Sequence, residues 1–154
     1  MKNMAYKNEK IQKKIALMNA KKKIQHLAYI EVIDFEDDTS QWLKLCETVL
    51  KQFRQIDSTP SEILTNTDKD SIMTWLKNSL DFLKEKKEWF ILIENDPFPV
   101  WANVKALDFD KAIEEIWLFS ENHSIIVADK ITGKIAQIFS EEKHFELHIG
   151  NCAI

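Results

Sequence analysis

Two histidines and a glutamate near the end of the chain are the residues whose types most readily suggest metal or acid–base chemistry. His144, Glu146 and His148 follow one another at intervals of two residues. In an extended strand such residues share one face, but four residues span about 13 Å, too far for both imidazoles to reach one ion through bonds of about 2 Å. We therefore expect solvent-facing side chains on a half-exposed sheet, with no metal site and no cofactor.

The cysteines and glycines argue against two further kinds of chemistry. Cys46 lies on the apolar stripe of an expected helix, where a thiol is normally inert, and Cys152 lies close to the end of the chain. They form no CxxC pair, and free thiols fit a reducing cytoplasm. With only 2 glycines, the chain is a poor match to a phosphate loop or a dinucleotide-binding fingerprint. We expect no catalytic residue and no enzyme activity.

Carboxylates are abundant and fall into runs. Paired carboxylates hydrolyse substrates when a cleft holds them about 5–9 Å apart, which spacing in a sequence does not reveal. A calcium loop is excluded because its glycine and its last glutamate are missing. Solvated surface and helix caps are one interpretation, and an acidic binding face is the other. The acids considered for such a face are Asp34, Glu36, Asp37, Asp38, Glu94, Asp96, Asp108, Asp110, Glu114, Glu115 and Glu121.

The charge is distributed unevenly along the chain. Residues 1–26 contain eight lysines and one acid, Glu9, and so carry +7. The other 128 residues carry −11, because the whole chain is at −4. The lysine-rich arm offers one aromatic residue, Tyr6, and a thin aliphatic stripe, a poor match to nucleic-acid or membrane binding, and the acidic body repels phosphates. We expect a solubilising, partly mobile helix, with no direct nucleic-acid or membrane partner.

The first half of the chain is expected to be mainly helical. The lysine-rich arm is expected to form a peripheral helix over 7–26, with Ile11, Ile15 and Met18 on one side. Residues 27–35 fit either a strand or a continuation of that helix. Thr59 to Glu62 resembles a capping box that starts a short helix. Two further helices are expected, each with an apolar stripe along one side. The first would be capped by a residue within 38–40, and the second would begin at Ser71. The stripe of the first helix consists of Trp42, Cys46, Val49, Leu50, Phe53 and Ile56, and that of the second consists of Ile72, Trp75, Leu76, Leu80 and Leu83.

The second half is expected to be mainly strands. Residues 89–93 form a continuous apolar run, typical of a strand covered on both faces, and 100–104 follow a proline-rich turn. Asp108 is expected to cap a brief helix through Ile116. Segments 124–130 and 134–140 form a hairpin, and 143–150 alternates, with Phe145, Leu147 and Ile149 inward.

Helices first and strands last favour an α+β fold rather than a doubly wound parallel sheet. We expect a single domain over 1–154 in which N-terminal helices pack on one face of a mostly antiparallel C-terminal sheet of four to six strands. Within it, 1–26 is basic, 27–87 mainly helical and 88–151 mainly strands. No segment approaches the ~20 apolar residues that span a bilayer, and no signal peptide stands out, so we expect a cytoplasmic protein.

The order of these elements resembles small bacterial immunity proteins of polymorphic toxin systems, including those of contact-dependent growth inhibition. The resemblance covers roughly residues 85–151. Its marks are the run Trp89 to Glu94, the proline turn, the strand 100–104, the short acidic helix, Glu121-Asn122-His123, the hairpin, and the late strand ending at Gly150.

Such a family implies a protein without catalysis that binds a cognate toxin C-terminal domain, often a nuclease, and blocks its active site or an adjoining surface. The acidic residues named above would then face the toxin, with Phe98 and Trp101 as apolar anchors. For Trp101, burial in the core is the alternative. Two other functions stay open: a small hydrolase using carboxylates with or without a divalent metal, and a regulatory or structural interaction protein.

Overall fold

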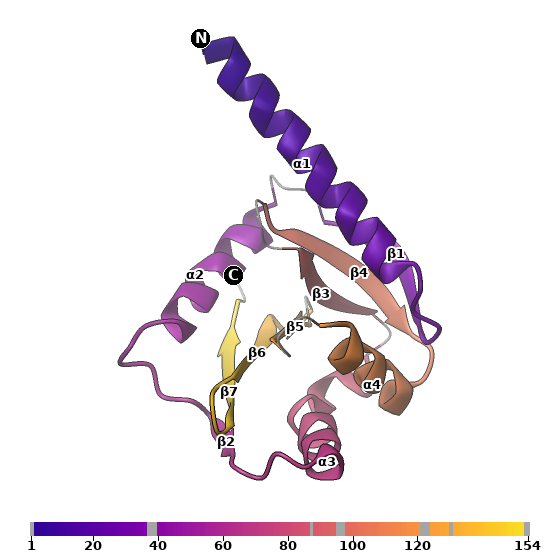
Figure 1. Cartoon of the computed structure of the whole chain (residues 1–154), viewed down its shortest axis with the longest axis vertical. Helices are drawn as coiled ribbons and strands as arrows, with labels where there is room; N and C mark the ends of the chain where they lie inside the picture. Colours follow the sequence, from indigo (N-terminus) through magenta and orange to yellow (C-terminus); the bar gives the residue numbers. More distant parts are fainter. Residues whose placement is uncertain are drawn as a thin grey trace.

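The computed structural model describes residues 2–36, 40–86, 88–94, 98–120, 124–129 and 131–152, with side chains from residue 8 onward except that of Glu94. These residues form an α+β fold, as expected (Figure 1). The helices are α1 (Lys2–Ile24), α2 (Gln41–Phe53), α3 (Lys69–Ser79) and α4 (Phe109–Phe119), with the 3₁₀ helix η1 (Asp81–Leu83). The strands are β1 (Ile30–Phe35), β2 (Glu62–Leu64), β3 (Glu88–Glu94), β4 (Val100–Ala106), β5 (Ile125–Ala128), β6 (Lys134–Ser140) and β7 (Phe145–Asn151).

The strands join in one antiparallel sheet in the order β1-β4-β3-β5-β6-β7-β2. The sheet has 7 strands, more than the four to six expected, because short segments from the helical half close both of its edges. The expected hairpin joins β5 and β6, and Gly133 in its turn has a φ of 79°, which favours glycine.

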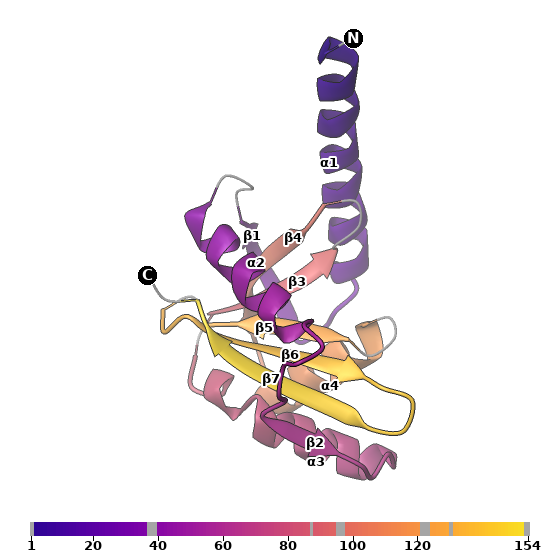
Figure 2. The same ribbon diagram turned by 90° about the vertical axis from the view of Figure 1, so that its left-hand side faces the viewer.

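Helices cover both faces of the sheet, so the expectation of helices on one face was wrong. α2 packs across one face, while α1, α3 and α4 lie against the other (Figures 1 and 2). The apolar run of β3 fits this arrangement: Trp89, Ile91 and Ile93 belong to the core under α1, α3 and α4, and Phe90 belongs to the core under α2. A strand buried on both faces needs apolar residues at successive positions, which explains the continuous run.

Trp101 belongs to the core beneath α2 and is not a surface anchor. Its side chain is 2% exposed, and its ring lies edge-on to Trp42 with the centroids 5.4 Å apart. Trp42 also contacts Phe90, with a centroid distance of 4.8 Å. The stripe of α2 is therefore core as expected, except that Ile56 lies beyond the end of the helix and is fully exposed.

The expected helix at Thr59 to Glu62 is replaced by the edge strand β2. The Ser61 amide donates to the carbonyl of Leu147 at 2.7 Å, and the Ile149 amide donates to the Ser61 hydroxyl at 3.3 Å. Pairing with β7 thus uses the amide of Ser61, which would lie in the first turn of the expected helix after its cap at Thr59. Pro60 suits the start of an edge strand because it has no amide hydrogen to lose.

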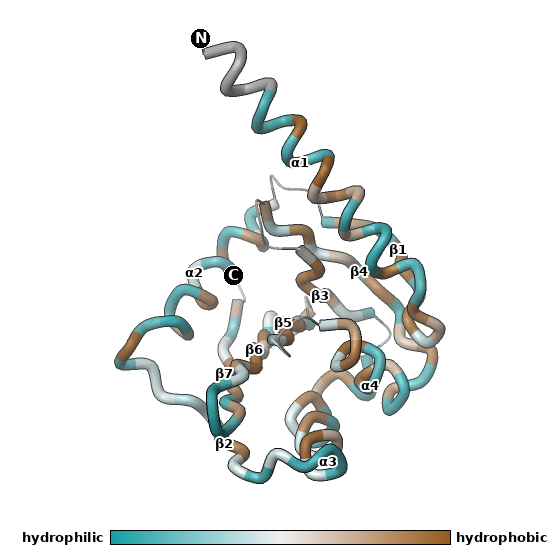
Figure 3. The backbone as a smooth tube through the Cα atoms, viewed as in Figure 1, coloured by the Kyte–Doolittle hydropathy of each residue, from teal (hydrophilic) through white to brown (hydrophobic). Residues whose placement is uncertain are grey.

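The helix α1 begins earlier than expected and packs through a different face. Ala16, Ala20 and Ile24 are buried against the sheet, whereas Ile11 and Met18 are each 54% exposed. The N-terminal half of α1 extends beyond the rest of the molecule (Figures 1 and 2), and apolar residues continue along this projecting part (Figure 3). Segment 27–35 forms a strand rather than a continuation of this helix.

Gly150 allows α2 to approach β7, and its replacement is expected to destabilise the fold. A Cβ at this position would lie 2.7 Å from Val49 Cγ1 and 3.0 Å from the Phe53 ring. We expect Gly150→Ala to lower the free energy of unfolding by about 1–3 kcal/mol, the usual cost of overpacking. Urea unfolding measures it, and adding Val49→Ala should recover part of the loss. A Gly150→Ala variant as stable as the parent chain would contradict this close packing.

Candidate functional site

A groove of about 610 Å³ lies between α1 and α2. It is built from four segments: one side of α1, the end of β1, one side of α2, and the residues that lead into β4. Its apolar members are Leu17, Phe35, Leu43, Phe98, Pro99 and Val100. Its charged members are Glu9, Lys10, Lys13, Lys14, Glu36, Lys44 and Glu47. A concave apolar surface with a mixed-charge border suits binding of a protein segment.

Helical spacing places the charged residues along the groove. Glu9 and Lys13 are one turn apart on α1, with a distance of 3.5 Å between the Lys13 Nζ and the Glu9 Oε1. The same Nζ lies 5.4 Å from the centre of the Phe98 ring, a cation–π geometry. On α2, Leu43 and Glu47 are likewise one turn apart, so the apolar part and the border come from the same helical face.

The structure brings only part of the expected acidic face to this groove. Glu36 and Phe98 line it, and Asp34 is exposed on the neighbouring edge strand β1. The expected binding residues Asp37, Asp38, Asp96 and Glu121, and the side chain of Glu94, lie outside the described residues. The other groove residues, such as Leu17, Leu43 and Glu47, carried no signal that set them apart from ordinary helix positions.

The acids of α4 mostly stabilise the fold. Asp108 accepts a hydrogen bond from the Lys111 amide at 3.0 Å and caps the helix, as expected. Glu115 accepts from the amides of Ala28 and Tyr29 at 2.7 and 2.6 Å, which fixes the link between α1 and β1. Glu114 pairs with a lysine of α3 at 3.0 Å. Asp110 is exposed, so these acids do not form one binding face.

The two cysteines, far apart in sequence, are neighbours in the core beneath α2. Cys46 is fully buried and Cys152 is 2% exposed. A hydrogen bond with Cys152, together with burial, raises the pKa of the Cys46 thiol far above its ordinary value. Burial of both thiols in an apolar core favours their uncharged form.

His148 is buried, contrary to the expectation that it faces solvent. Its ring is 3% exposed and lies between Phe53 of α2 and Phe139 of β6, with centroid distances of 5.4 and 5.1 Å. The end of α2 covers this part of β7, which the alternation within one strand does not reveal.

Glu146 joins the two histidines. Its Oε2 lies 2.8 Å from His144 Nε2 and its Oε1 lies 3.3 Å from His148 Nε2. The hydrogen bond with His144, and then that with His148, lowers the pKa of Glu146. Within the described part of the chain, no three histidine, cysteine or acidic side chains gather as metal ligands would.

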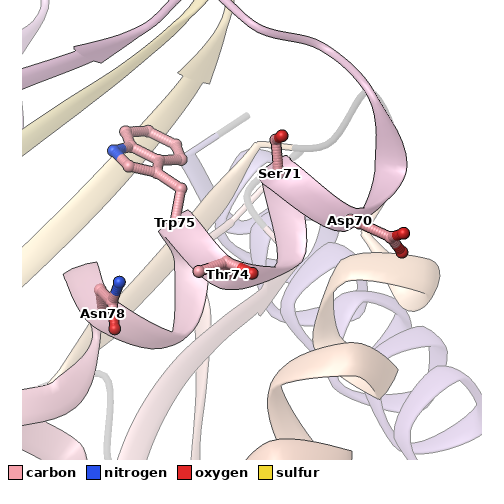
Figure 4. A pocket seen from close by; sticks show the side chains of 5 residues that line it. All are labelled: Asp70, Ser71, Thr74, Trp75 and Asn78. Carbon is pink, nitrogen blue, oxygen red and sulfur yellow. The ribbon is translucent and has the colours of Figure 1, made fainter.

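A second, shallower depression of about 430 Å³ lies on the surface of α3. Its members are Asp70, Ser71, Thr74, Trp75 and Asn78, and their side chains point in different directions rather than toward a common point (Figure 4). Near its start, Asp68 caps α3 by accepting from the amide and the hydroxyl of Ser71 at 3.1 and 2.6 Å, which lowers the Asp68 pKa. This capping explains the local polar contacts without a ligand.

Comparison with known proteins yields no relatives. No protein-family model matches the chain, and neither curated proteins nor solved structures give a match. None of the described helices is both long and apolar enough to cross a bilayer.

Two variants, each with one acid of α4 replaced, should distinguish a carboxylate that stabilises the fold from one that is only solvated. Glu115→Ala leaves the amides of Ala28 and Tyr29 without their acceptor, so we expect a loss of about 1–3 kcal/mol in the free energy of unfolding. Asp110→Ala, on the exposed side of the same helix, should stay within about 0.5 kcal/mol of the parent chain. Chemical unfolding measures both. Equal effects of the two substitutions would contradict a structural role for Glu115.

The lowered pKa of Glu146 predicts a pH-dependent contribution to stability. A carboxyl whose pKa is lower in the folded than in the unfolded state stabilises the fold above the unfolded value, here about 4.5, and this contribution is lost as the pH falls through the folded pKa. The difference in melting temperature between the parent chain and Glu146→Gln should therefore shrink from about pH 5.5 to about pH 3. Glu142→Gln, on the exposed turn nearby, is the control. A difference that stays constant over this range would contradict the assignment.

Proposed function

We propose that this chain is an immunity protein that binds and neutralises a cognate bacterial toxin domain of the nuclease type in the cytoplasm. The observation that carries the proposal is the groove between α1 and α2, whose apolar members and charged border fit an inserted segment of a protein partner. The partly exposed Phe98 would provide an apolar contact to the partner.

The charge next to the groove supports a basic partner. Glu31 and Asp34 are exposed on β1, and Glu36 follows them into the groove; we call these three residues the acidic edge. The residues after position 26 carry −11 in total. Nucleases present basic surfaces to their substrates, so an acidic surface would speed their encounter with the inhibitor and improve discrimination. Covering such a basic surface would block access of the nucleic acid.

The groove and the acidic edge do not depend on the α4 carboxylates, which are largely engaged within the fold. The hydrolase alternative required carboxylates that converge in a cleft. The groove contains three glutamates and four lysines, so its border is of mixed charge. This arrangement favours binding over carboxylate catalysis.

Co-expression with a toxin domain tests the proposal. A gene directly upstream that encodes an exported protein with a variable C-terminal domain is expected, and that domain should be toxic alone and harmless with this chain. The double variant Phe98→Ala, Glu36→Lys should weaken the complex at least about tenfold, because it removes an apolar contact and reverses a charge in the groove. Isothermal titration measures the affinity.

The charge-matched control is Glu142→Lys, which lies in the turn between β6 and β7 and does not line the groove. It should bind within about twofold of the parent chain. Failure of the chain both to rescue growth and to form a complex with the toxin domain would refute the proposed function. A complex that tolerates the groove variant as well as the control would refute the groove as its site.

A further inference from the structure

The helix α1 has two apolar faces, and the molecule uses only one of them. Ala16, Ala20 and Ile24 are 0%, 0% and 2% exposed against the sheet. At about 100° per residue, Ile11, Ile15 and Met18 project from the opposite side of the helix. They are 54%, 48% and 54% exposed. We call these three residues the outer stripe.

The outer stripe has the spacing of a helix-pairing seam. Steps of four and then three residues repeat the a and d positions of a heptad, which keep a narrow apolar line along one side of a helix. Asn8, Gln12 and Asn19 flank this line on one side, and the exposed Lys22 follows it one turn beyond Met18. A line this narrow, without tryptophan or phenylalanine, suits a second helix better than the broad apolar face that inserts into a membrane.

The projecting half of α1 carries the Glu9–Lys13 ion pair and the contact of Lys13 with Phe98, but its outer side packs on nothing within the described residues. It extends beyond the sheet (Figures 1 and 2), and a short helix without tertiary packing is marginal in water. No acidic residue lies in its first turn, while residues 1–26 carry +7. Positive charge near a helix N-terminus opposes the helix dipole. A negatively charged partner along this half would offset both effects.

We propose that the outer stripe of α1 binds an amphipathic helix of a partner protein whose residues beside its own apolar line are acidic. Apolar side chains of that helix would pack between Ile11, Ile15 and Met18, and its carboxylates would pair with Lys22, which lies one turn beyond Met18 on the same side of α1. A second copy of this chain is disfavoured because it would bring +7 against +7. The partner is therefore a different protein with a complementary charge.

This surface is separate from the groove of the proposed function, and neither depends on the other. The groove uses the side of α1 that carries Lys10, Lys13, Lys14 and Leu17, which faces α2. Lys21 also lies on that side, with its Nζ 5.8 Å from the centre of the Phe35 ring. The outer stripe lies on the side of α1 away from the sheet. Both surfaces can be occupied at once, and the outer stripe attracts acidic rather than basic partners.

Binding of designed peptides to the full chain tests the inference. The first probe is a labelled helical peptide of about three heptads with Leu at a and d and Glu at e and g, whose like charges oppose its own pairing. The second has Lys in place of each Glu, and the third has Ser in place of each Leu. In fluorescence anisotropy, we expect the first peptide to bind at least about tenfold more tightly than either of the others.

Variants of the chain locate the binding site. Ile11→Ser with Ile15→Ser should weaken binding of the acidic peptide at least about tenfold. The matched control, Gln12→Ser with Asn19→Ser, changes two residues on the same helix beside the stripe and should stay within about twofold. Circular dichroism of each variant confirms that α1 is retained.

Three results would overturn the inference. The first is equal binding of the acidic peptides with Leu and with Ser, which would reduce the interaction to charge alone. The second is a dimer in sedimentation equilibrium that the Ile11→Ser, Ile15→Ser variant abolishes, which would make a second copy the partner. The third is recruitment of the parent chain, but not of this variant, to phosphatidylcholine vesicles containing phosphatidylserine, without binding to the acidic peptide.

Discussion

The packing of α2 against the sheet is the contact on which both layers of this fold depend. The central strands carry apolar side chains on both faces, and α1, α3 and α4 bury only one of them. Without α2, Phe90, Trp101 and Ile135 would face water, which at about 1.5–3 kcal/mol per large side chain is a large fraction of the stability of a small domain. The close approach at Gly150 lets one amphipathic helix cover this face.

Local patterns predicted the elements well where a segment's own surroundings decided its structure. The apolar run of β3 and the cap of α4 by Asp108 are examples. Prediction failed where a distant segment decided the outcome. His148 follows the expected alternation of β7, yet α2 covers that side. Thr59 to Glu62 has the residue types of a capping box, yet β7 pairs with the amide and the hydroxyl of Ser61 within it. Neither partner is visible from local periodicity.

The candidate site was harder to predict than the fold because acidic residues serve several purposes. Aspartate and glutamate in a short helix are as useful for capping and for anchoring a loop as for binding, and Asp108 and Glu115 do the former. Glu36 and Phe98 were found because a charged run and a proline turn both indicate surface. Leu17 and Leu43 look like ordinary helix positions in the sequence, because their shared place in the groove depends on how the sheet positions α1 and α2.

The helix α1 shows why an apolar stripe does not identify its own partner. Ile11, Ile15 and Met18 are more apolar than Ala16 and Ala20, yet the alanines face the sheet because small side chains let a helix backbone lie close to the strands. The larger side chains are then left on the outside, next to the lysines. The same helix therefore borders two different surfaces: the groove on its inner side, which has a border of mixed charge and lies beside the acidic edge, and a basic apolar line on its outer side. Because the two surfaces differ in their charge pattern, the proposed groove partner and the proposed helical partner would be selected by different contacts.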